Sequence, residues 1–246
     1  SGQFCPFWLT VCFGTLRPRC VVGIEINSMP DPLDEDLREL AGAVEVPTLG
    51  HYLTKGFCGF EIRRIAGTRP MIGPAVTLSM PPGDSTLLHY TADQVRPGDV
   101  VVISHGEDYR SAPVGAVLAS VLAHRGAAGV VIDGVCTDVD ALMAVGLPVY
   151  ARGTSALTTK LLGLDEGGVN VPITCAGVDV EPGMVVLGDA NGVLCVDREE
   201  LRILLPEAIT DDSEEPALID ALTRGSARLG QECGANELLR GLGAIV

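Results

Sequence analysis

The residue types that could do chemistry gather in two short segments of this chain. One segment opens a predicted helix that begins at Pro113, and it consists of Gly115, Ala116, Val117 and Leu118. The first N–H groups of a helix have no partner within the helix, so they can hold a carboxylate, and Gly115 has no side chain to obstruct such a ligand. The alternative interpretation is that Gly115 merely permits close packing.

The second segment, Thr137 and Asp138, follows an apolar, strand-like run over residues 129–132. Open α/β sheets bind ligands in the loops at the carboxyl ends of their parallel strands, where we expect this pair. The oxygen atoms of Asp138 are hard donors, of the kind that Mg²⁺ or Mn²⁺ prefers. From the residues alone, however, Asp138 fits better as the N-cap of a helix over residues 139–145.

Further polar side chains follow the neighbouring strands. His105 could act as a general base near neutral pH and Arg110 could supply a cation, although a solvated loop is the plainer interpretation of this run. Arg152 and Lys160 follow the next strand. Four acidic residues cluster near the C-terminus, and each is best explained as part of an exposed helix face. They are Asp211, Asp212, Glu214 and Glu215.

Alternating strands and helices must position these segments. Apolar runs bounded by turn residues predict strands over residues 74–80, 100–104, 129–132 and 147–150. Helical spacing and start signals predict helices over residues 31–41, 87–94, 113–126 and 139–145, and a short helix from Pro47 that carries His51 and Tyr52. The β-α-β-α-β order over residues 100–150 indicates parallel strands. After Gly167 we expect short strands at Gly-containing turns, and from Arg198 an acidic helical tail.

The composition is typical of a folded α/β protein. A chain of 246 residues with 47% apolar residues and a mean hydropathy of +0.32 is not a disordered chain. The net charge of −15 disfavours binding to nucleic acid phosphates, and no apolar run reaches the length of a membrane span. The eight Cys show no CxxC spacing, which favours reduced thiols. We therefore expect a cytoplasmic protein without nucleic acid or membrane partners.

Residues 1–28 differ from the rest of the chain. They contain three of the five Phe, the one Trp and three of the eight Cys. The apolar stretch precedes Arg17 and Arg19, which is the wrong order for a signal peptide. We predict a peripheral N-terminal extension over residues 1–28, either an upstream segment before Met29 or an arm that packs on a partner subunit. Residues 29–246 are predicted to form a single domain with a helical C-terminal tail.

Six motifs occur in an order and spacing that resemble one family. They are GPAVTL (73–78), PGDVVV (97–102), GVVIDG (129–134), NVPIT (170–174), PG (182–183) and DANGV (189–193). The chain resembles the 4-hydroxy-4-methyl-2-oxoglutarate aldolases and the regulator of ribonuclease activity A over about residues 33–230. The resemblance implies a β/β/α fold like the phosphohistidine swivelling domain, here with a central parallel βαβαβ portion and added short β-strands. It also implies a homotrimer or a dimer of trimers.

The aldolases of this family are metal-dependent and release pyruvate from 2-oxo acids at sites between subunits. Cleavage leaves an enolate, which a divalent cation stabilises as a Lewis acid. By resemblance, residues 115–118 bind the substrate and Asp138 binds Mg²⁺ or Mn²⁺. Thr137 stands where the family has an Arg, and a neutral hydroxyl cannot replace its bidentate charged fork. Ala116 and His51 stand where many members have acidic residues.

Three functions are therefore considered. The first is a divalent-metal lyase of aldolase or decarboxylase type that acts on a small 2-oxo acid, with altered or weak activity, Asp138 on the metal, and Thr137 and residues 115–118 lining the substrate. The second is a non-catalytic binding protein like the ribonuclease regulator. The third, a methyltransferase, lacks the Gly-rich loop that S-adenosylmethionine binding requires.

Overall fold

The continuous apolar runs form the middle of a nine-stranded sheet in the computed structural model, which describes residues 23–244. Four strands lie side by side and parallel: β3 (Met71–Ser79), β4 (Val100–Ser104), β5 (Gly129–Cys136) and β6 (Val149–Thr154). Their apolar side chains are buried on both faces, which explains why these runs show no polar alternation. The predicted α/β class with a central parallel portion is confirmed.

Shorter strands extend the sheet at both ends. β7 (Glu166–Val169) pairs with β3 and carries β1 (Gly23–Ile26) at the outer edge, whereas β2 (Arg63–Ala66) pairs antiparallel with β6. β1 falls in the predicted N-terminal extension, and residues 1–22 of that extension lie outside the described residues.

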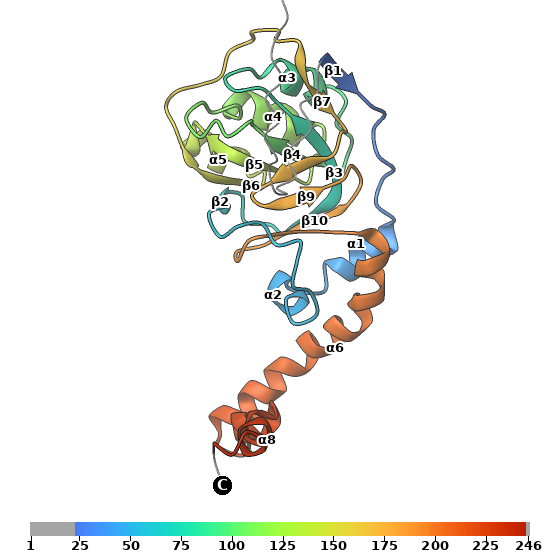
Figure 1. Cartoon of the computed structure of the whole chain (residues 1–246), viewed down its shortest axis with the longest axis vertical. Helices are drawn as coiled ribbons and strands as arrows, with labels where there is room; N and C mark the ends of the chain where they lie inside the picture. The colour runs from blue at the N-terminus through green and yellow to red at the C-terminus, as the bar shows by residue number, and fades with distance from the viewer. Residues whose placement is uncertain (1–22, 245–246) are drawn as a thin grey trace, which may run out of the picture.

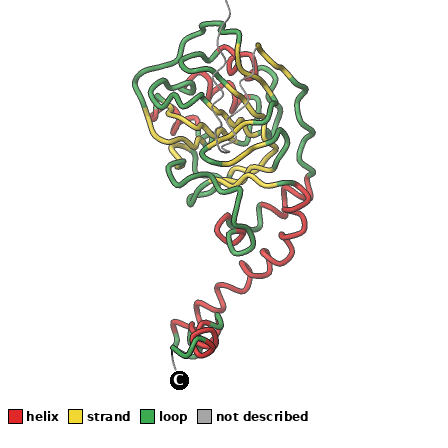
Figure 2. The backbone as a smooth tube through the Cα atoms, in the orientation of Figure 1, coloured by secondary structure: helices red, strands yellow, loops and turns green. Residues whose placement is uncertain are grey.

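Helices cover one face of the sheet, and further β-structure covers the other (Figures 1 and 2). The helices are α3 (Thr86–Ala92), α4 (Ala116–His124) and α5 (Val139–Val145), and their apolar residues share one core cluster with the sheet. On the opposite face lie the separate hairpin of β8 (Ile173–Cys175) and β9 (Val178–Val180) and the last two strands of the nine. These are β10 (Val185–Gly188), which pairs antiparallel with the first residues of β3, and β11 (Val193–Val196), which pairs with β10. The predicted short strands after Gly167 are thus present.

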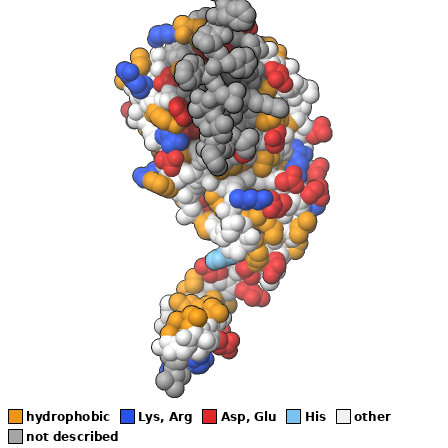
Figure 3. All heavy atoms as spheres, viewed as in Figure 1, with side chains coloured by type: hydrophobic (Ala, Val, Ile, Leu, Met, Phe, Trp, Pro, Cys, Tyr) orange, Lys and Arg blue, Asp and Glu red, His pale blue; other side chains and the backbone are white. Residues whose placement is uncertain are grey.

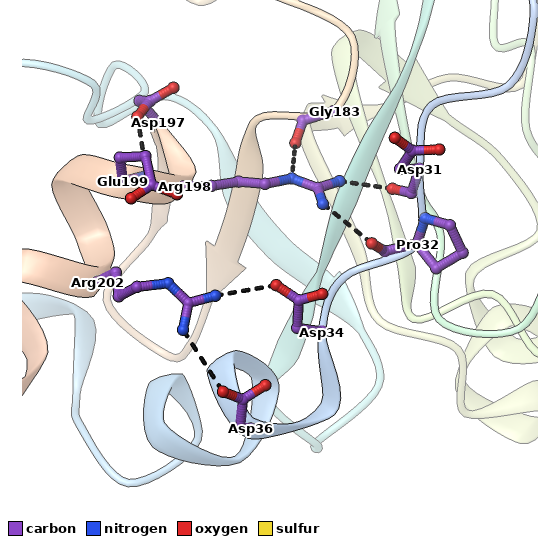
Figure 4. Close-up of polar contacts among 9 residues, drawn as sticks. All are labelled: Asp31, Pro32, Asp34, Asp36, Gly183, Asp197, Arg198, Glu199 and Arg202. Carbon is purple, nitrogen blue, oxygen red and sulfur yellow. Dashed lines mark hydrogen bonds and ion pairs between the residues drawn. The ribbon is translucent and has the colours of Figure 1, made fainter.

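A last helical layer packs on β10 and β11. It contains α1 (Glu35–Ala41), α2 (Val46–Leu49) and the first turns of α6 (Arg198–Thr223). Here the predicted start of the first helix at Asp31 is wrong, because α1 begins at Glu35. The carbonyl groups of Asp31 and Pro32 accept hydrogen bonds from Arg198, which holds this stretch outside the helix (Figure 4).

The acidic C-terminal tail is helical, as predicted. Asp197 caps α6 by accepting hydrogen bonds from the N–H groups of Glu199 and Glu200 at 2.8 and 3.2 Å. The last buried residue of the helix is Ala208. Beyond it α6 projects from the body, with α7 (Leu229–Glu232) and α8 (Ala235–Gly241) at its far end (Figure 1). Among residues 23–244, no helix combines the length and apolar character needed to cross a membrane.

Candidate functional site

The two segments singled out in the sequence lie next to each other. Val114, just before α4, forms a parallel bridge with Cys136 at the end of β5, and its carbonyl group accepts a hydrogen bond from the N–H of Thr137 at 2.9 Å. This pairing continues the sheet by one step and places the first turn of α4 beside Thr137 and Asp138. The site therefore forms at the carboxyl ends of the parallel strands.

Asp138 adopts a left-handed backbone conformation, with φ 56° and ψ 43°. Few residues other than Gly adopt it, although Asp is among the more tolerant, and such conformations concentrate at functional sites. Asp138 occupies the N-cap position of α5, but its side chain makes no capping hydrogen bond to that helix. Instead, Oδ2 accepts a hydrogen bond from the N–H of Ala116 at 2.9 Å. The carboxylate thus caps α4 rather than α5.

Gly115 provides the space that this arrangement requires. Its backbone is extended, at φ −136° and ψ −162°, so the conformation itself does not demand Gly. A Cβ atom at this position, however, would lie 2.5 Å from Oδ2 of Asp138 and 2.8 Å from Cγ2 of Thr137. Gly115 therefore packs closely against the two candidate site residues, Thr137 and Asp138.

Two N–H groups in the first turn of α4 have no hydrogen-bond partner among the described residues. The N–H groups of Val117 and Leu118 make no hydrogen bond with any residue from 23 to 244. The Val117 side chain is 74% exposed, whereas the Leu118 side chain is 7% exposed and packs in the core. Unpaired first-turn N–H groups and the positive end of the helix dipole favour a carboxylate at this point.

Asp138 is expected to bind a metal ion, and the described residues place no group of further metal-binding side chains around it. Across the described residues, no three His, Cys, Asp or Glu side chains converge closely enough to hold a metal ion. Asp138 is exposed, and Oδ1 has only a 3.3 Å hydrogen bond from the Thr137 hydroxyl. A single hard carboxylate fits Mg²⁺ or Mn²⁺ that keeps most of its water ligands, and it does not fit a closed structural metal site.

His105 and Arg110 are not part of this site. His105 is 1% exposed, neither ring nitrogen has a hydrogen-bond partner in the described chain, and burial lowers the pKa of its imidazole. Asp108 orders the same loop by accepting hydrogen bonds from the N–H groups of Arg110 and Ser111, both at 2.9 Å. Arg110 lines a separate cavity of about 440 Å³.

Arg152 and Lys160 are likewise engaged elsewhere. The Arg152 guanidinium pairs with Asp133 at 2.5 Å and Glu61 at 2.8 Å, and it lies 4.6 Å from the centre of the Tyr109 ring. The Arg152 charge is therefore neutralised by these two carboxylates within the fold. Sequence spacing does not predict the pairing with Glu61, because the two residues are 91 positions apart. Lys160 is exposed and donates a hydrogen bond to Thr158.

The acidic cluster on α6 holds helices together. Asp212 accepts hydrogen bonds from the N–H of Glu45, at 2.8 Å, and from the Thr48 hydroxyl. Asp211 accepts one from Tyr52, and this hydrogen bond raises the pKa of the phenol to about 12. Asp211 is exposed, as expected for a polar helix face, whereas Asp212 is partly buried against α2. His51 lies in the turn after α2, in the layer across the sheet from α4.

Comparison with known proteins shows one consistent family. A sequence model of the family described as "RraA-like: Aldolase/RraA" matches residues 48–195. A Halalkalibacterium halodurans protein named "Putative 4-hydroxy-4-methyl-2-oxoglutarate aldolase" is 33% identical over 154 residues, which cover 61% of this chain and 72% of that protein.

Two solved structures are also similar to this chain. One, described as the RNA-processing inhibitor RraA from Thermus thermophilis, is 26% identical with a TM-score of 0.56, over 62% of this chain and 92% of that one. The other, described as an S-adenosylmethionine:2-dimethylmenaquinone methyltransferase from Geobacillus kaustophilus, is 32% identical with a TM-score of 0.54, over 57% and 86%. The names attached to these proteins thus span three activities, while the fold is shared.

Proposed function

The chain belongs to the RraA-like family, and on that premise we propose that it is a lyase of aldolase or decarboxylase type that releases pyruvate from a small 2-oxo acid. One observation carries the proposal: the unpaired N–H groups of Val117 and Leu118 lie in the helical turn whose Ala116 N–H binds the Asp138 carboxylate. A carboxylate-binding helix end and a metal-binding carboxylate are the two groups that such a reaction requires.

The substrate carboxylate accepts hydrogen bonds from the N–H groups of Val117 and Leu118, where the helix dipole favours negative charge. Ala116 fixes Oδ2 of Asp138, so that Oδ1 is the oxygen atom left for Mg²⁺ or Mn²⁺. When bound, the cation supplies Lewis-acid stabilisation of the enolate.

The Thr137 hydroxyl has one hydrogen bond to donate, which goes to Oδ1 of Asp138 at 3.3 Å in the single chain and turns to the substrate carbonyl oxygen in the proposed complex. It is neutral, whereas an Arg at this position would offer two charge-assisted hydrogen bonds. Preorganised donors at a developing oxyanion commonly contribute a factor of about 10² to 10³ in rate. We therefore expect turnover that is weak by comparison with a member that has the Arg.

A second candidate, a non-catalytic regulator that binds a protein partner, is favoured by one specific observation. The carboxylate of Asp138 already satisfies the Ala116 N–H, and no cationic side chain among residues 23–244 makes a hydrogen bond or ion pair with Thr137 or Asp138. A site that binds no substrate would have the same arrangement. The net charge of −15 suits a basic surface on a protein partner.

We also propose that the chain assembles as a homotrimer, which can double to a hexamer. The projecting end of the chain carries exposed apolar side chains, which are visible at the far tip in Figure 3 and include Leu229, Leu238, Leu239 and Leu242. α7 and α8 contain no buried residue in the single chain. Packing against another copy would remove this apolar surface from water. Light scattering that gives the mass of one chain at micromolar concentration would contradict the proposal.

Pyruvate release from oxaloacetate and from a 4-hydroxy-2-oxo acid, with Mg²⁺ or Mn²⁺ and with chelator, tests the lyase. We expect metal-dependent release that Asp138→Asn abolishes and Asp140→Asn leaves unchanged, because Asp140 is also exposed in the first turn of α5 but caps no neighbouring helix. A structure soaked with Mn²⁺ and pyruvate should show density at Asp138 and at the α4 N-terminus. Absence of turnover and of density in the unaltered protein would support the regulator instead.

A further inference from the structure

Three cysteines from distant parts of the chain meet on the face of the sheet opposite α4. Cys58 lies between α2 and β2, Cys175 ends β8, and Cys195 lies in β11. The N–H of Cys58 donates to the carbonyl group of Val193 at 2.9 Å, and the N–H of Cys195 donates to that of Gly56 at 2.8 Å. These hydrogen bonds align the Cys58 segment antiparallel with β11, so that both side chains point into the same apolar cluster, where Cys175 also packs.

A second backbone contact holds the Cys58 segment next to the end of β8. The N–H of Gly59 donates to the carbonyl group of Ala176, the residue after Cys175, at 3.0 Å. The Sγ atom of Cys58 lies 4.0 Å from the carbonyl oxygen of Cys175. Cys58 is therefore held near Cys175 by the hydrogen bond between Gly59 and Ala176, the residues that follow the two cysteines.

The three thiols differ in exposure. Cys175 and Cys195 are 0% and 1% exposed, whereas Cys58 is only partly buried. All three are free thiols in the structure. Only Cys58 can therefore meet a reagent from solvent directly.

The buried pair changes the acidity of Cys58. Hydrogen bonds from Cys175 and Cys195 lower the pKa of the Cys58 thiol to about 5, against the opposing effects of burial, Asp133 and Glu61. The same hydrogen bonds, together with burial, raise the pKa of Cys175 and Cys195 above the ordinary range. These directions make Cys58 the most acidic of the three thiols.

We propose that Cys58 is a peroxide-reactive thiol and that Cys175 is its resolving partner, so that a hydroperoxide converts the pair into a disulfide. The Cys58 thiolate attacks one peroxide oxygen, the O–O bond breaks, and an S–O bond forms. Hydrogen peroxide thereby yields hydroxide, which takes up a proton to give water, and Cys58 becomes a sulfenic acid. The Cys175 sulfur then attacks the Cys58 sulfur, its proton leaves with the departing hydroxide as a second water, and the S–S bond forms.

The order of these steps follows from the charges. Hydrogen bonding to Cys58, burial and the charge of a Cys58 thiolate all raise the pKa of the Cys175 thiol. Oxidation to the neutral sulfenic acid removes that charge, which makes Cys175 easier to deprotonate at the moment when it must attack. The contact between Gly59 and Ala176 already restrains the two segments, so closing the bond orders little further chain.

Mass spectrometry of the full chain after graded hydrogen peroxide tests the pairing. Trypsin releases Cys58 in residues 56–63 but leaves Cys175 and Cys195 together in residues 161–198, so cleavage after Met184 with cyanogen bromide is needed to separate them. We expect residues 56–63 to be joined to the fragment with Cys175, with the loss of two hydrogen atoms. A link to the Cys195 fragment would overturn the assignment of the partner, and a Cys58 that stays reduced while Cys233 oxidises would overturn the proposal.

Two variants and a pH profile separate reactivity from structure. Cys175→Ser should stop the disulfide and leave a Cys58 sulfenic acid that a diketone probe traps, whereas Cys58→Ser should remove both products. The rate of alkylation of an ordinary exposed thiol falls on the order of 70-fold from pH 8 to pH 6, because the thiolate fraction falls. The rate at Cys58 should change by less than about 3-fold over this range. Cys233, which is exposed, serves as the reference, and parallel profiles for the two would refute the proposal.

Discussion

Oδ2 of Asp138 accepts a hydrogen bond from the N–H of Ala116 at 2.9 Å, and this bond joins the end of β5 to the start of α4. It places a carboxylate at the positive end of a helix whose next two N–H groups remain unpaired in the described chain. The left-handed backbone of Asp138 directs the side chain across to α4 instead of along its own helix. The proposed substrate and metal positions are therefore fixed relative to each other by one contact.

Gly115→Ala is expected to displace Asp138. The new Cβ would lie 2.5 Å from Oδ2, so the exposed Asp138 carboxylate must move away, which breaks its hydrogen bond to the N–H of Ala116. We expect a loss of stability of about 0.5 to 2 kcal/mol from the lost helix cap, together with weaker Mn²⁺ binding. Urea unfolding and Mn²⁺ titration measure the two effects.

Gly153→Ala is the matched control, because a Cβ atom added to this residue of β6 would have no other atom within 4 Å. It should leave Mn²⁺ binding unchanged. Equal effects of the two substitutions would show that Gly115 has no special relation to Asp138.

Thr137→Arg tests whether the missing cation limits catalysis. The guanidinium should stabilise the developing oxyanion, and we expect pyruvate release to rise about 10-fold or more, which corresponds to about 1.4 kcal/mol of transition-state stabilisation. The double variant Ala116→Asp with Thr137→Arg should release pyruvate faster than either single variant. Steady-state kinetics with oxaloacetate gives the comparison, and Thr174→Arg, on the opposite face of the sheet, is the control for added charge. If turnover stays absent in every variant, the regulator becomes the better explanation.

Much of the fold could be predicted because its strands are long apolar runs. The strand over residues 100–104 has the predicted bounds, since a run that is buried on both faces begins and ends where polar or turn residues appear. β1, β2 and β7 were missed. Each is four residues long and contains Gly or Arg, so its pairing depends on the neighbouring strand rather than on its own pattern.

The candidate site was predicted in part, for a similar reason. The proximity of Gly115 to Asp138 follows from the order of parallel strands, which sequence periodicity reveals. The direction of the Asp138 side chain does not, because it depends on one left-handed backbone conformation and on a cap that crosses between elements 22 residues apart. The pairing of Arg152 with Glu61 has the same character: it links residues that no local pattern connects.

Asp84 should make stability depend on acid. Burial alone raises the pKa of its carboxyl group, but hydrogen bonds from Thr86, Leu164 and Leu162 outweigh this and lower the pKa to about 2. Because the folded pKa lies below the unfolded value of about 3.9, the stabilisation is present above about pH 4 and is lost as the pH falls toward 2.

Asp84→Asn should therefore destabilise the protein by roughly 2 kcal/mol at pH 6, and the difference from the unaltered protein should shrink as the pH falls to 2. Denaturant unfolding at a series of pH values measures this convergence. Asp93→Asn, at an exposed position after α3, should show no such trend. If the difference in the free energy of unfolding stayed constant from pH 6 to pH 2, the effect of Asp84→Asn would come from altered packing and hydrogen bonding rather than from the lost charge.

Arg198→Ala should loosen the attachment of α6 to the body. Its guanidinium donates to the carbonyl groups of Gly183 and Pro32, both at 2.9 Å, and to that of Asp31, and the substitution leaves these acceptors without a partner (Figure 4). We expect a loss of about 2 kcal/mol in the free energy of unfolding. Arg224→Ala removes only an exposed ion pair with Asp220 and should change stability by less than about 0.5 kcal/mol. Comparable losses for both would show that the carbonyl contacts add little.

The projection of α6 beyond Ala208 has a hydrodynamic consequence. Its last 15 residues, through Thr223, extend about 22 Å at the usual rise of an α-helix, and α7 and α8 add bulk at the end of that rod. A single chain of this shape experiences more friction in solution than a sphere of equal mass. If the rod lies along a neighbouring body, the frictional ratio falls even though the mass rises. Sedimentation velocity therefore reports the position of the rod separately from the number of chains.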